Sequence, residues 1–451
     1  MKNEHSYNAA LEWIHGLSRF GSKPGLERIS AMLELVGNPH REVRFVHIAG
    51  TNGKGSTAAI LASVISAAGY QVGLYTSPYL LSFTNRMSVN GHDIDHEELA
   101  GLVNQVKPLV EKISSDQRFG QPTEFEVVTV LALIYFARRN VDLVVLEVGL
   151  GGRLDATNIV TPLLSVITNV SLEHTDVLGD TVEAIAAEKA GIIKKNVPVL
   201  TAVEDQKAFE VVKSRASRLK APFYRSCPLT LNYDKETACP TFIRQAVTEE
   251  GQIFNYHGFS NTLENLFIPL RGIYQLTNAT TALAAAELLV DSGFTVDEEA
   301  ICRGLSTVNW PARLELMKNK PKVVMDGAHN PAAVKNLAAA LPEYFRYRQL
   351  IMVFGIMADK DGQAMLESIL PMCDQVIFTR AAIPRAADPR QIADLALKEL
   401  GYSKQQIQVI EDVGVALKKG MDLASPEDLV LVTGSFYTVS DARAYWKQVL
   451  M

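Results

Sequence analysis

One stretch of the sequence decides the fold: HIAGTNGKGS at residues 47–56. It links an apolar run at residues 43–49 to a helix-like run at residues 57–68. A strand, a glycine-rich turn and a helix start offer a polyphosphate close backbone approach and free N–H groups. In that arrangement Lys54 binds the phosphates, and the Ser56 hydroxyl is a ligand for magnesium. The stretch predicts a phosphate loop between a strand and a helix.

This loop is a shortened variant of the strict pattern G-x-x-x-x-G-K-[ST]. Ile48 stands where the first glycine of that pattern would be, and Gly55 separates Lys54 from Ser56. The alternative is a glycine-rich turn with a solvent-exposed lysine, but the flanking strand and helix favour the phosphate loop. We expect nucleotide contacts from the whole loop: Gly50, Thr51, Asn52, Gly53, Lys54, Gly55 and Ser56.

A long stretch of sequence after the loop contains no charged side chain. No charged residue occurs between Lys54 and Arg86. A membrane span would need about 20 predominantly apolar residues, whereas Gly69, Gly73 and Pro78 interrupt this stretch. We therefore expect a buried helix followed by a buried strand at the centre of the fold.

Short apolar runs alternate with helical segments further along the chain. This alternation indicates a parallel sheet that helices cover on both faces. The runs lie at residues 43–49, 71–75, 142–148, 163–170 and 197–203. Between residues 222 and 270 the pattern changes, and alternating stretches at 241–247 and 252–257 predict a small antiparallel addition.

A second series of short strands follows an alanine-rich helix at 278–290 and the pair Trp310–Pro311. Its members lie at residues 323–325, 350–354, 375–379, 408–411 and 429–432. Strands with intervening helices of this kind make a second doubly wound domain. We expect a phosphate-loop α/β domain at residues 1–308 and a smaller Rossmann-like α/β domain at residues 309–451.

The composition is that of an ordinary globular protein with two or three domains. The 451 residues include 44 Lys and Arg, 50 Asp and Glu and 47% hydrophobic residues, with a formal net charge of -6. This balance and the lack of a basic stripe argue against a nucleic-acid partner and against an anionic membrane surface. The N-terminal residues also lack the apolar region of a signal peptide.

Cysteine usage points to a reducing compartment. Cys227, Cys239, Cys302 and Cys373 are far apart and form no C-x-x-C pair. We therefore expect neither a zinc site nor a disulfide framework. A cytoplasmic location fits this cysteine usage best.

Ser77, Glu147 and His174 each lie at or just beyond the end of a predicted strand. The carboxyl ends of parallel strands share one edge of a sheet, so these side chains can converge on Ser56 and the phosphates. Magnesium takes oxygen ligands in octahedral geometry. Taken singly, each residue also has a structural interpretation: a turn former before proline, a buried hydrogen-bond acceptor, and a histidine paired with Glu173.

Further motifs, in order along both predicted domains, extend the match to a known family. They are TSP at 76–78, EVGLGGRLDATN at 147–158, EKAGIIK at 188–194, WPARLE at 310–315 and DGAHN at 326–330. Together with the phosphate loop, they resemble the motifs of folylpolyglutamate synthases. The wider superfamily is that of the Mur ligases, which are ATPases that form amide bonds. The resemblance implies that the larger domain carries the phosphate loop and metal site and that the smaller domain closes over the nucleotide.

The resemblance also implies roles for single residues. Lys189 matches a lysine that is carbamylated in the family, and a carbamate supplies oxygen ligands that an ammonium cannot. From the residues alone, Lys189 would be a lysine on a helix surface. The magnesium-related positions of the family fall on Ser56, Ser77, Glu147 and His174. The nucleotide-contacting positions fall on Asn278, Arg313, Asp326 and His329. ATP and Mg²⁺, at two metal sites, are the implied cofactors.

Several positions depart from the family pattern. Tyr79 and Asn85 replace a histidine and a glutamate on the loop that borders the folate. Glu173 replaces an aspartate and keeps the acidic neighbour of the following histidine, and Tyr274 replaces a histidine. None of these departures removes a nucleotide or metal ligand.

The implied reaction is ATP-dependent ligation of L-glutamate to the γ-carboxylate of a reduced, polyglutamylated folate through an acyl phosphate. In that reaction Lys54 and magnesium neutralise charge on the transferring phosphoryl group, and His174 is a metal ligand rather than a base. Two substrates and no macromolecular partner are implied. A monomer is sufficient, because each domain has its own core.

Three alternatives remain open at this point. A dihydrofolate synthase, alone or as a bifunctional enzyme, uses the same chemistry on dihydropteroate. A Mur-type ligase fits less well, since the block at 147–158 belongs to the folate branch. A nucleotide-driven switch is disfavoured because the chain lacks the guanine-reading pattern N-K-x-D.

Overall fold

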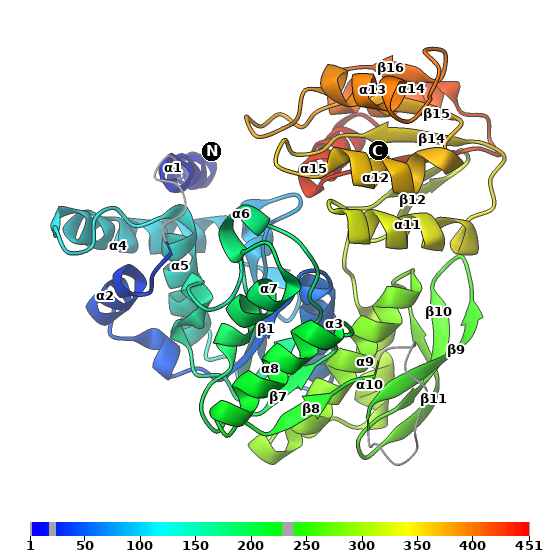
Figure 1. Ribbon diagram of the computed structural model, residues 1–451. Helices are drawn as coiled ribbons and strands as arrows, with labels where there is room; N and C mark the ends of the chain where they lie inside the picture. Colours follow the sequence, from blue (N-terminus) through cyan, green and yellow to red (C-terminus); the bar gives the residue numbers. More distant parts are fainter. Residues whose placement is uncertain (1, 18–23, 228–238, 451) are drawn as a thin grey trace. The chain divides into compact units, whose positions relative to one another are not determined.

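The computed structural model describes residues 2–17, 24–227 and 239–450 (Figure 1). The chain divides into two compact units, with the main boundary between Val308 and Asn309. Unit 1 contains Met1–Arg244, Phe254–Phe267 and Leu276–Val308, and unit 2 contains Gln245–Ile253, Ile268–Gln275 and Asn309–Met451. Two short segments that precede residue 308 in sequence therefore group with unit 2. No helix within the described ranges combines the length and the apolar character that a bilayer span requires.

Unit 1 is built around an eight-stranded sheet in the order β4-β3-β2-β5-β1-β6-β7-β8. The strands are β1 (Phe45–Ala49), β2 (Val72–Tyr75), β3 (Met87–Val89), β4 (His92–Asp93), β5 (Leu143–Glu147), β6 (Leu164–Ile167), β7 (Val199–Thr201) and β8 (Phe223–Arg225). From β2 to β8 neighbouring strands are parallel, whereas β3 and β4 add an antiparallel edge. The predicted parallel sheet is confirmed. The sequence pattern missed β3, β4 and β8, because strands this short carry no periodic signal.

Helix α3 (Lys54–Ala67) follows β1 directly and is buried on almost every side. Helix α10 (Glu298–Thr307) packs against it at Gly304, where any side chain would collide with the backbone of Val64. The Ser63 hydroxyl donates to the Gly304 carbonyl at 2.7 Å. The predicted buried helix and strand are α3 and β2, and their burial is consistent with the absence of charged residues there.

The other α-helices described in the first 308 residues are α1 (Lys2–Gly16), α2 (Glu27–Leu35), α4 (His96–Ser115), α5 (Glu124–Arg138), α6 (Thr175–Leu178), α7 (Val182–Lys189), α8 (Gln206–Arg218) and α9 (Ile273–Leu288). Among them, α1 and α2 pack against α4 and α5 (Figure 1). The predicted alanine-rich helix is α9, which begins earlier than its sequence pattern.

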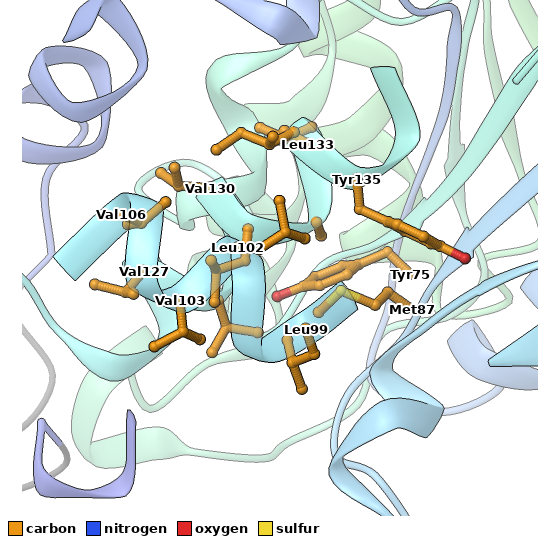
Figure 2. Close-up of a cluster of buried hydrophobic side chains, with 14 of the residues drawn as sticks. Tyr75, Met87, Leu99, Leu102, Val103, Val106, Val127, Val130, Leu133 and Tyr135 are labelled. Atoms are coloured by element: carbon orange, nitrogen blue, oxygen red, sulfur yellow. The ribbon is translucent and has the colours of Figure 1, made fainter. Parts of the chain in front are cut away.

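A large apolar core lies where α4 and α5 meet strands β2 and β3 (Figure 2). Leu99, Leu102 and Val106 recur at helical spacing on α4, so that they form one apolar face. Figure 2 shows Leu99 and Leu102 beside Tyr75 of β2 and Met87 of β3, and Val106 beside Val130 of α5. Burying each such side chain contributes about 1.5–3 kcal/mol. The core thereby fixes β2, whose carboxyl end carries Ser77.

The predicted antiparallel addition is a three-stranded sheet in the order β11-β10-β9. Its strands are β9 (Thr241–Val247), β10 (Gln252–His257) and β11 (Thr262–Ile268). The turn between β9 and β10 closes with two backbone hydrogen bonds between Thr248 and Gly251, at 2.9 and 3.3 Å. Reciprocal bonds of this kind are typical of a hairpin.

One expectation about cysteine was wrong, because Cys227 and Cys239 form a disulfide. Their Cα atoms lie 5.7 Å apart, 12 residues apart in sequence. The Cys227 N–H donates to the Pro240 carbonyl at 2.8 Å, which brings the end of β8 beside the start of β9. The pairing depends on this contact between two strands, which the cysteine spacing did not reveal. Cys302 and Cys373 are free thiols.

Unit 2 contains a six-stranded sheet in the order β12-β13-β17-β14-β15-β16. The strands are β12 (Glu315–Asn319), β13 (Lys322–Met325), β14 (Leu350–Phe354), β15 (Gln375–Phe378), β16 (Ile407–Val409) and β17 (Leu429–Thr433). All neighbours from β13 to β16 are parallel, and β12 is antiparallel to β13. The predicted Rossmann-like arrangement is confirmed. The sequence pattern missed β12, an edge strand without an apolar run.

The helices that follow β13 along the chain connect the parallel strands, except the last helix, which follows β17 (Figure 1). They are α11 (Pro331–Tyr344), α12 (Gly362–Ile369), α13 (Pro389–Lys398), α14 (Val413–Leu423) and α15 (Phe436–Tyr445). An acceptor side chain caps each of them: Asn330, Asp361, Asp388, Asp412 and Ser435. Caps of this kind define where each helix begins.

Candidate active site

The phosphate loop joins the end of β1 at Ala49 to the start of α3 at Lys54. Gly53 caps α3 with a φ of 83°, a conformation that glycine adopts without steric cost. A side chain at Gly53 would collide with the amide of Asn278, and one at Gly50 would collide with the hydroxyl of Thr168. The glycines therefore admit two polar neighbours directly against the loop backbone. Asn278, a predicted nucleotide contact, lies on one of these sides.

Lys54 reaches back over its own loop. Its Nζ donates to the carbonyl oxygens of Gly50 and Thr51, at 3.0 Å each. The ammonium group thus stays at the mouth of the loop, beside the first turn of α3. The first N–H groups of a helix have no partner within the helix and favour anions. The loop therefore presents both a cation and free backbone donors, as phosphate binding requires.

Ser77 and Glu147 lie together at the edge of the sheet. Strands β2 and β5 are parallel neighbours, with Tyr75 opposite Leu146, so their carboxyl ends are adjacent. The Ser77 N–H donates to Glu147 Oε2 at 3.2 Å, and the Glu147 side chain is buried. The structure brings these two candidates into contact. Their oxygens are the hard donors that Mg²⁺ prefers.

Ser56 lies buried in the first turn of α3. His174 precedes α6 and has a φ of 52°, which places it at a sharp change of chain direction beyond β6. Within the described residues, no three His, Cys, Asp or Glu side chains form a group that would hold a metal ion. A metal at this edge would therefore need serine hydroxyls, and water, beside Glu147. That donor set fits Mg²⁺, which usually keeps several waters.

Lys189 ends α7 and is buried, with only 4% of its surface exposed. Burial, together with the positive charge of Lys54, lowers the pKa of Lys189 to about 7, although the Glu173 carboxylate acts in the opposite direction. Lys189 therefore lies near enough to Lys54 and Glu173 to interact with them electrostatically. The lowered pKa increases the fraction of neutral amine at neutral pH, and only the neutral amine is a nucleophile toward carbon dioxide.

Three further candidates lie close together in unit 2. Asp326 follows β13, and its carboxylate accepts from the backbone N–H groups of Leu314 at 2.9 Å and Ala328 at 2.8 Å. Burial raises the pKa of Asp326, while the charges of Arg313 and His329 oppose that rise. The Arg313 guanidinium lies 4.5 Å from the centre of the Phe436 ring. The structure thus brings Arg313, Asp326 and His329 to one end of the unit 2 sheet.

The backbone around Arg313 is unusual. Ala312 and Leu314, on either side of it, have φ values of 59° and 44°. Residues with a side chain rarely adopt this region, and holding them there costs about 1 kcal/mol or more each. Both side chains are fully buried, and the carboxylate of Asp326 holds the Leu314 N–H. Packing and one carboxylate therefore impose the turn that presents Arg313.

Sequence reasoning missed the residues that hold the phosphate loop from outside. Thr168 Oγ1 donates to the Asn52 carbonyl at 2.7 Å, and Asn169 Oδ1 accepts from the Asn52 N–H at 2.7 Å. These residues follow β6, the neighbour of β1. A signal was present, because Thr168 and Asn169 interrupt the apolar run at 163–170. Its meaning depends on the strand order, which the sequence does not give.

Comparisons with known proteins agree with this geometry. Residues 48–286 match the Mur ligase middle domain, and residues 312–436 match the Mur ligase, glutamate ligase domain. A Bacillus subtilis protein named dihydrofolate synthase/folylpolyglutamate synthase is 39% identical over 97% of this chain and 98% of its own length. The resemblance inferred from the motifs is confirmed.

Two solved structures carry ligands that bear on the site. A Mycobacterium tuberculosis folylpolyglutamate synthase, complexed with ADP and AMPPCP, has a TM-score of 0.88 and 33% identity over 98% of this chain and 99% of its own. A bifunctional folylpolyglutamate synthase/dihydrofolate synthase from Yersinia pestis, complexed with AMPPNP and a Mn ion, has a TM-score of 0.83 and 30% identity over 98% of each chain. The chain belongs to the folylpolyglutamate synthase/dihydrofolate synthase family of Mur ligases.

Proposed function

We propose that this chain is an ATP-dependent ligase that joins L-glutamate to the γ-carboxylate of a reduced, polyglutamylated folate. The observation that carries the proposal is the edge of the unit 1 sheet. There a phosphate loop with its lysine, two paired candidates for metal binding and a buried lysine of low pKa occur in one unit. Membership of the ligase family supports the reaction class, and the motifs of the folate branch support the substrate.

The chemistry requires an activated carboxylate, because a free carboxylate is a poor acyl donor. ATP supplies the phosphoryl group that converts it to an acyl phosphate, and Mg²⁺ supplies countercharge on the phosphates. The glutamate amine then attacks the acyl carbon, the C–N bond forms, and phosphate leaves with the former carboxylate oxygen. The chain itself contributes position, charge and exclusion of water.

In this proposal the loop from Gly50 to Ser56 forms the phosphate-binding site together with Asn278. Lys54 moves its ammonium from the loop carbonyls to the phosphate oxygens. The metal is held by Ser56, Ser77, Glu147, His174 and Lys189. The proposed contacts of unit 2 with the nucleotide are Arg313, Asp326 and His329.

We propose that Lys189 is carbamylated. Its neutral amine would attack carbon dioxide, form an N–C bond and lose one proton, which leaves a carbamate anion. The low pKa of Lys189 favours this reaction at neutral pH, because a protonated amine has no free electron pair. The anion would add oxygen donors to the serine hydroxyls and Glu147, and it would replace a buried positive charge beside Lys54 with a negative one.

Dihydropteroate is a second candidate acceptor for glutamate, besides folate. The B. subtilis relative carries both activity names, dihydrofolate synthase and folylpolyglutamate synthase. The same site would join glutamate to dihydropteroate by the same chemistry. We propose the folate reaction as the main activity and the dihydropteroate reaction as its alternative or companion, in a cytoplasmic enzyme that acts as a monomer.

The test uses purified full-length protein, ATP, Mg²⁺ and labelled L-glutamate. Tetrahydrofolate and dihydropteroate are assayed in parallel, with each substrate omitted in turn. The proposal predicts incorporation of label into tetrahydrofolate that depends on ATP. Incorporation into dihydropteroate alone would make the chain a dihydrofolate synthase. No incorporation with either acceptor, together with ATP hydrolysis that no folate affects, would contradict a ligase and favour a nucleotide-driven switch.

A further inference from the structure

A set of hydrogen bonds ties the phosphate loop to the segment that follows β6. The Thr51 N–H donates to the Asn169 carbonyl at 3.0 Å, and the Asn52 N–H donates to Asn169 Oδ1 at 2.7 Å. The Thr51 hydroxyl donates to the Ser171 carbonyl at 3.2 Å and accepts from the Ser171 N–H at 3.1 Å. Thr168 Oγ1 donates to the Asn52 carbonyl at 2.7 Å. We call this set the loop latch.

Asn169 is the centre of the loop latch, because it holds two successive peptide groups. Its backbone carbonyl accepts from Thr51 and its side-chain oxygen accepts from Asn52. The Asn52 N–H can only donate a hydrogen bond. The side-chain atom of Asn169 that faces it must therefore be the oxygen and not the nitrogen. Both N–H groups are thus already bonded within the protein. Phosphate donors must then come from the next residues, at the start of α3.

A loop with this composition needs such a constraint. Gly50, Gly53 and Gly55 give it a wide choice of conformations, which a bound nucleotide would have to restrict. Ordering a flexible loop on binding reduces affinity, and a loop ordered in advance avoids that loss. The latch orders the Thr51 and Asn52 peptides before any nucleotide binds.

The same segment leads into the metal side of the site. Ser171 is followed within three residues by Glu173 and His174. Val170, between the two latch residues Asn169 and Ser171, is buried in the core with Ala49 and Val148. The latch segment is therefore anchored in the core and linked along the chain to both sides of the site.

We propose that Asn169 is a positioning residue for nucleotide binding, which sets the phosphate loop in its binding conformation by holding the Asn52 peptide. The inference rests on the proposed function, since it gives that loop a nucleotide to bind. Asn169 acts on the loop backbone rather than on the reacting atoms. Its loss should therefore weaken the binding of nucleotide and leave the binding of glutamate unchanged.

The experiment compares the full-length parent with Asn169→Ala by calorimetric titration with ADP and Mg²⁺. Losing one backbone contact and the order it imposes should raise the Kd for ADP about tenfold. In the ligase assay the KM for ATP should rise by a similar factor, while the KM for glutamate stays within about twofold, as expected when one distant binding step is unaffected. A structural defect alone would not separate the two KM values.

Thr201→Val is the matched control. The buried Thr201 hydroxyl donates to the Ile167 carbonyl at 3.1 Å and accepts from the Val203 N–H at 3.2 Å, so this variant also loses side-chain hydrogen bonds beside β6. Thr201 forms none of the hydrogen bonds of the loop latch, so this variant should keep the parent's affinity for ADP. Unchanged ADP affinity in Asn169→Ala, or equal losses in both variants, would overturn the proposal.

If Asn169→Ala does not fold, a measurement on the parent protein can still test the proposal. Hydrogen exchange of the Asn52 amide, without nucleotide, should be slow because Asn169 holds it. Exchange as fast as that of an unprotected loop amide would overturn the proposal. Neither ADP binding nor exchange needs a folate. A parent that binds ADP but ligates no glutamate would therefore contradict the proposed function and leave the role of Asn169 measurable.

Discussion

In unit 1 the phosphate loop turns at Gly53, whereas in unit 2 the turn around Arg313 is made by Ala312 and Leu314, two residues with side chains and positive φ. Glycine takes this conformation at no steric cost, so the first loop is unstrained but free to move. Side chains make the second turn costly, so it exists only where packing enforces it. Hydrogen bonds that the loop N–H groups donate to Asn169 order the first loop, and burial together with the Asp326 carboxylate enforces the second.

This difference separates two kinds of sensitivity to mutation. Polar residues around the unit 1 loop are held by contacts that cost little to remove, so their loss should affect activity far more than stability. The unit 2 turn is part of the packing of that unit, so its loss should affect stability first. The predictions that follow are designed to break or sharpen this contrast.

Lys54→Ala should give the largest effect on activity. Among the described residues, the ammonium bonds the loop carbonyls of Gly50 and Thr51, so the fold loses little. The reaction loses the charge nearest the transferring phosphoryl group, which corresponds to roughly a thousandfold in kcat. Lys207→Ala removes an exposed lysine of α8, 3.6 Å from Glu183, and serves as the matched control. Steady-state rates and thermal unfolding of both variants test the prediction, and a large loss of stability in Lys54→Ala would contradict it.

Lys189→Met should lower kcat strongly, though less than Lys54→Ala does, and yet stabilise the fold at neutral pH. Folding lowers the pKa of Lys189 to about 7, so the unfolded state binds its proton more tightly. The parent then gains stability as pH rises from about 7 toward the unfolded value near 10.4, by roughly 5 kcal/mol. The variant should lack this gain. Denaturant unfolding at several pH values, in buffers free of carbon dioxide, measures the difference.

An identical pH dependence of unfolding in the parent and in Lys189→Met would show that Lys189 is not buried as an amine. Mass spectrometry of the intact parent, kept in bicarbonate, tests the carbamate separately. A mass increase equal to one carbon dioxide in the parent, and no such increase in Lys189→Met, would support carbamylation. Arg supplies no such nucleophile at neutral pH, so Lys189→Arg should also fail to gain this mass.

Asp326→Asn should destabilise the protein while changing catalysis less than Lys54→Ala does. The carboxylate accepts from two backbone N–H groups, but an amide offers one oxygen and turns a donor toward the other. A buried donor left unpaired costs about 2 kcal/mol. Asp361→Asn is the control, because Asp361 caps α12 and asparagine caps helices equally well. Equal unfolding midpoints for the two variants would refute the role of Asp326 in the turn.

Phe436→Leu should give the smallest effect. It removes the ring below the Arg313 guanidinium, an interaction of about 0.5–1 kcal/mol, so the KM for ATP should rise about threefold. Phe209→Leu removes the equivalent ring below Arg225, 4.1 Å from the guanidinium, and is the control. If both variants change the KM for ATP alike, the contact of Arg313 with the nucleotide is not supported.

Much of the fold could be predicted because apolar runs and helix starts are local signals. The runs at 43–49 and 350–354 became β1 and β14. Strands such as β4 and β12 were missed because they lie at sheet edges and bury little. The Cys227–Cys239 disulfide was missed for a related reason, since it depends on how β8 meets the following hairpin.

Site residues could be predicted only where the chemistry of the side chain, together with its place at the end of a strand, indicated a role. Ser77 and Glu147 could be expected at one edge because parallel strands end together, and the structure places them in contact. The role of Asn169 could not be predicted from the sequence, because it depends on β6 lying beside β1. The turn around Arg313 could not either, since Ala312 and Leu314 give no turn signal in sequence.

The central claim is that this chain makes an amide bond by phosphorylating a carboxylate. The most direct test supplies tetrahydrofolate with oxygen-18 in its γ-carboxylate, together with ATP, Mg²⁺ and L-glutamate, and analyses the released phosphate. An acyl phosphate passes one labelled oxygen to phosphate in each ligation. We predict labelled phosphate in step with product formation in the parent, and about a thousandfold slower release of it in Lys54→Ala. Ligation with unlabelled phosphate would contradict the account.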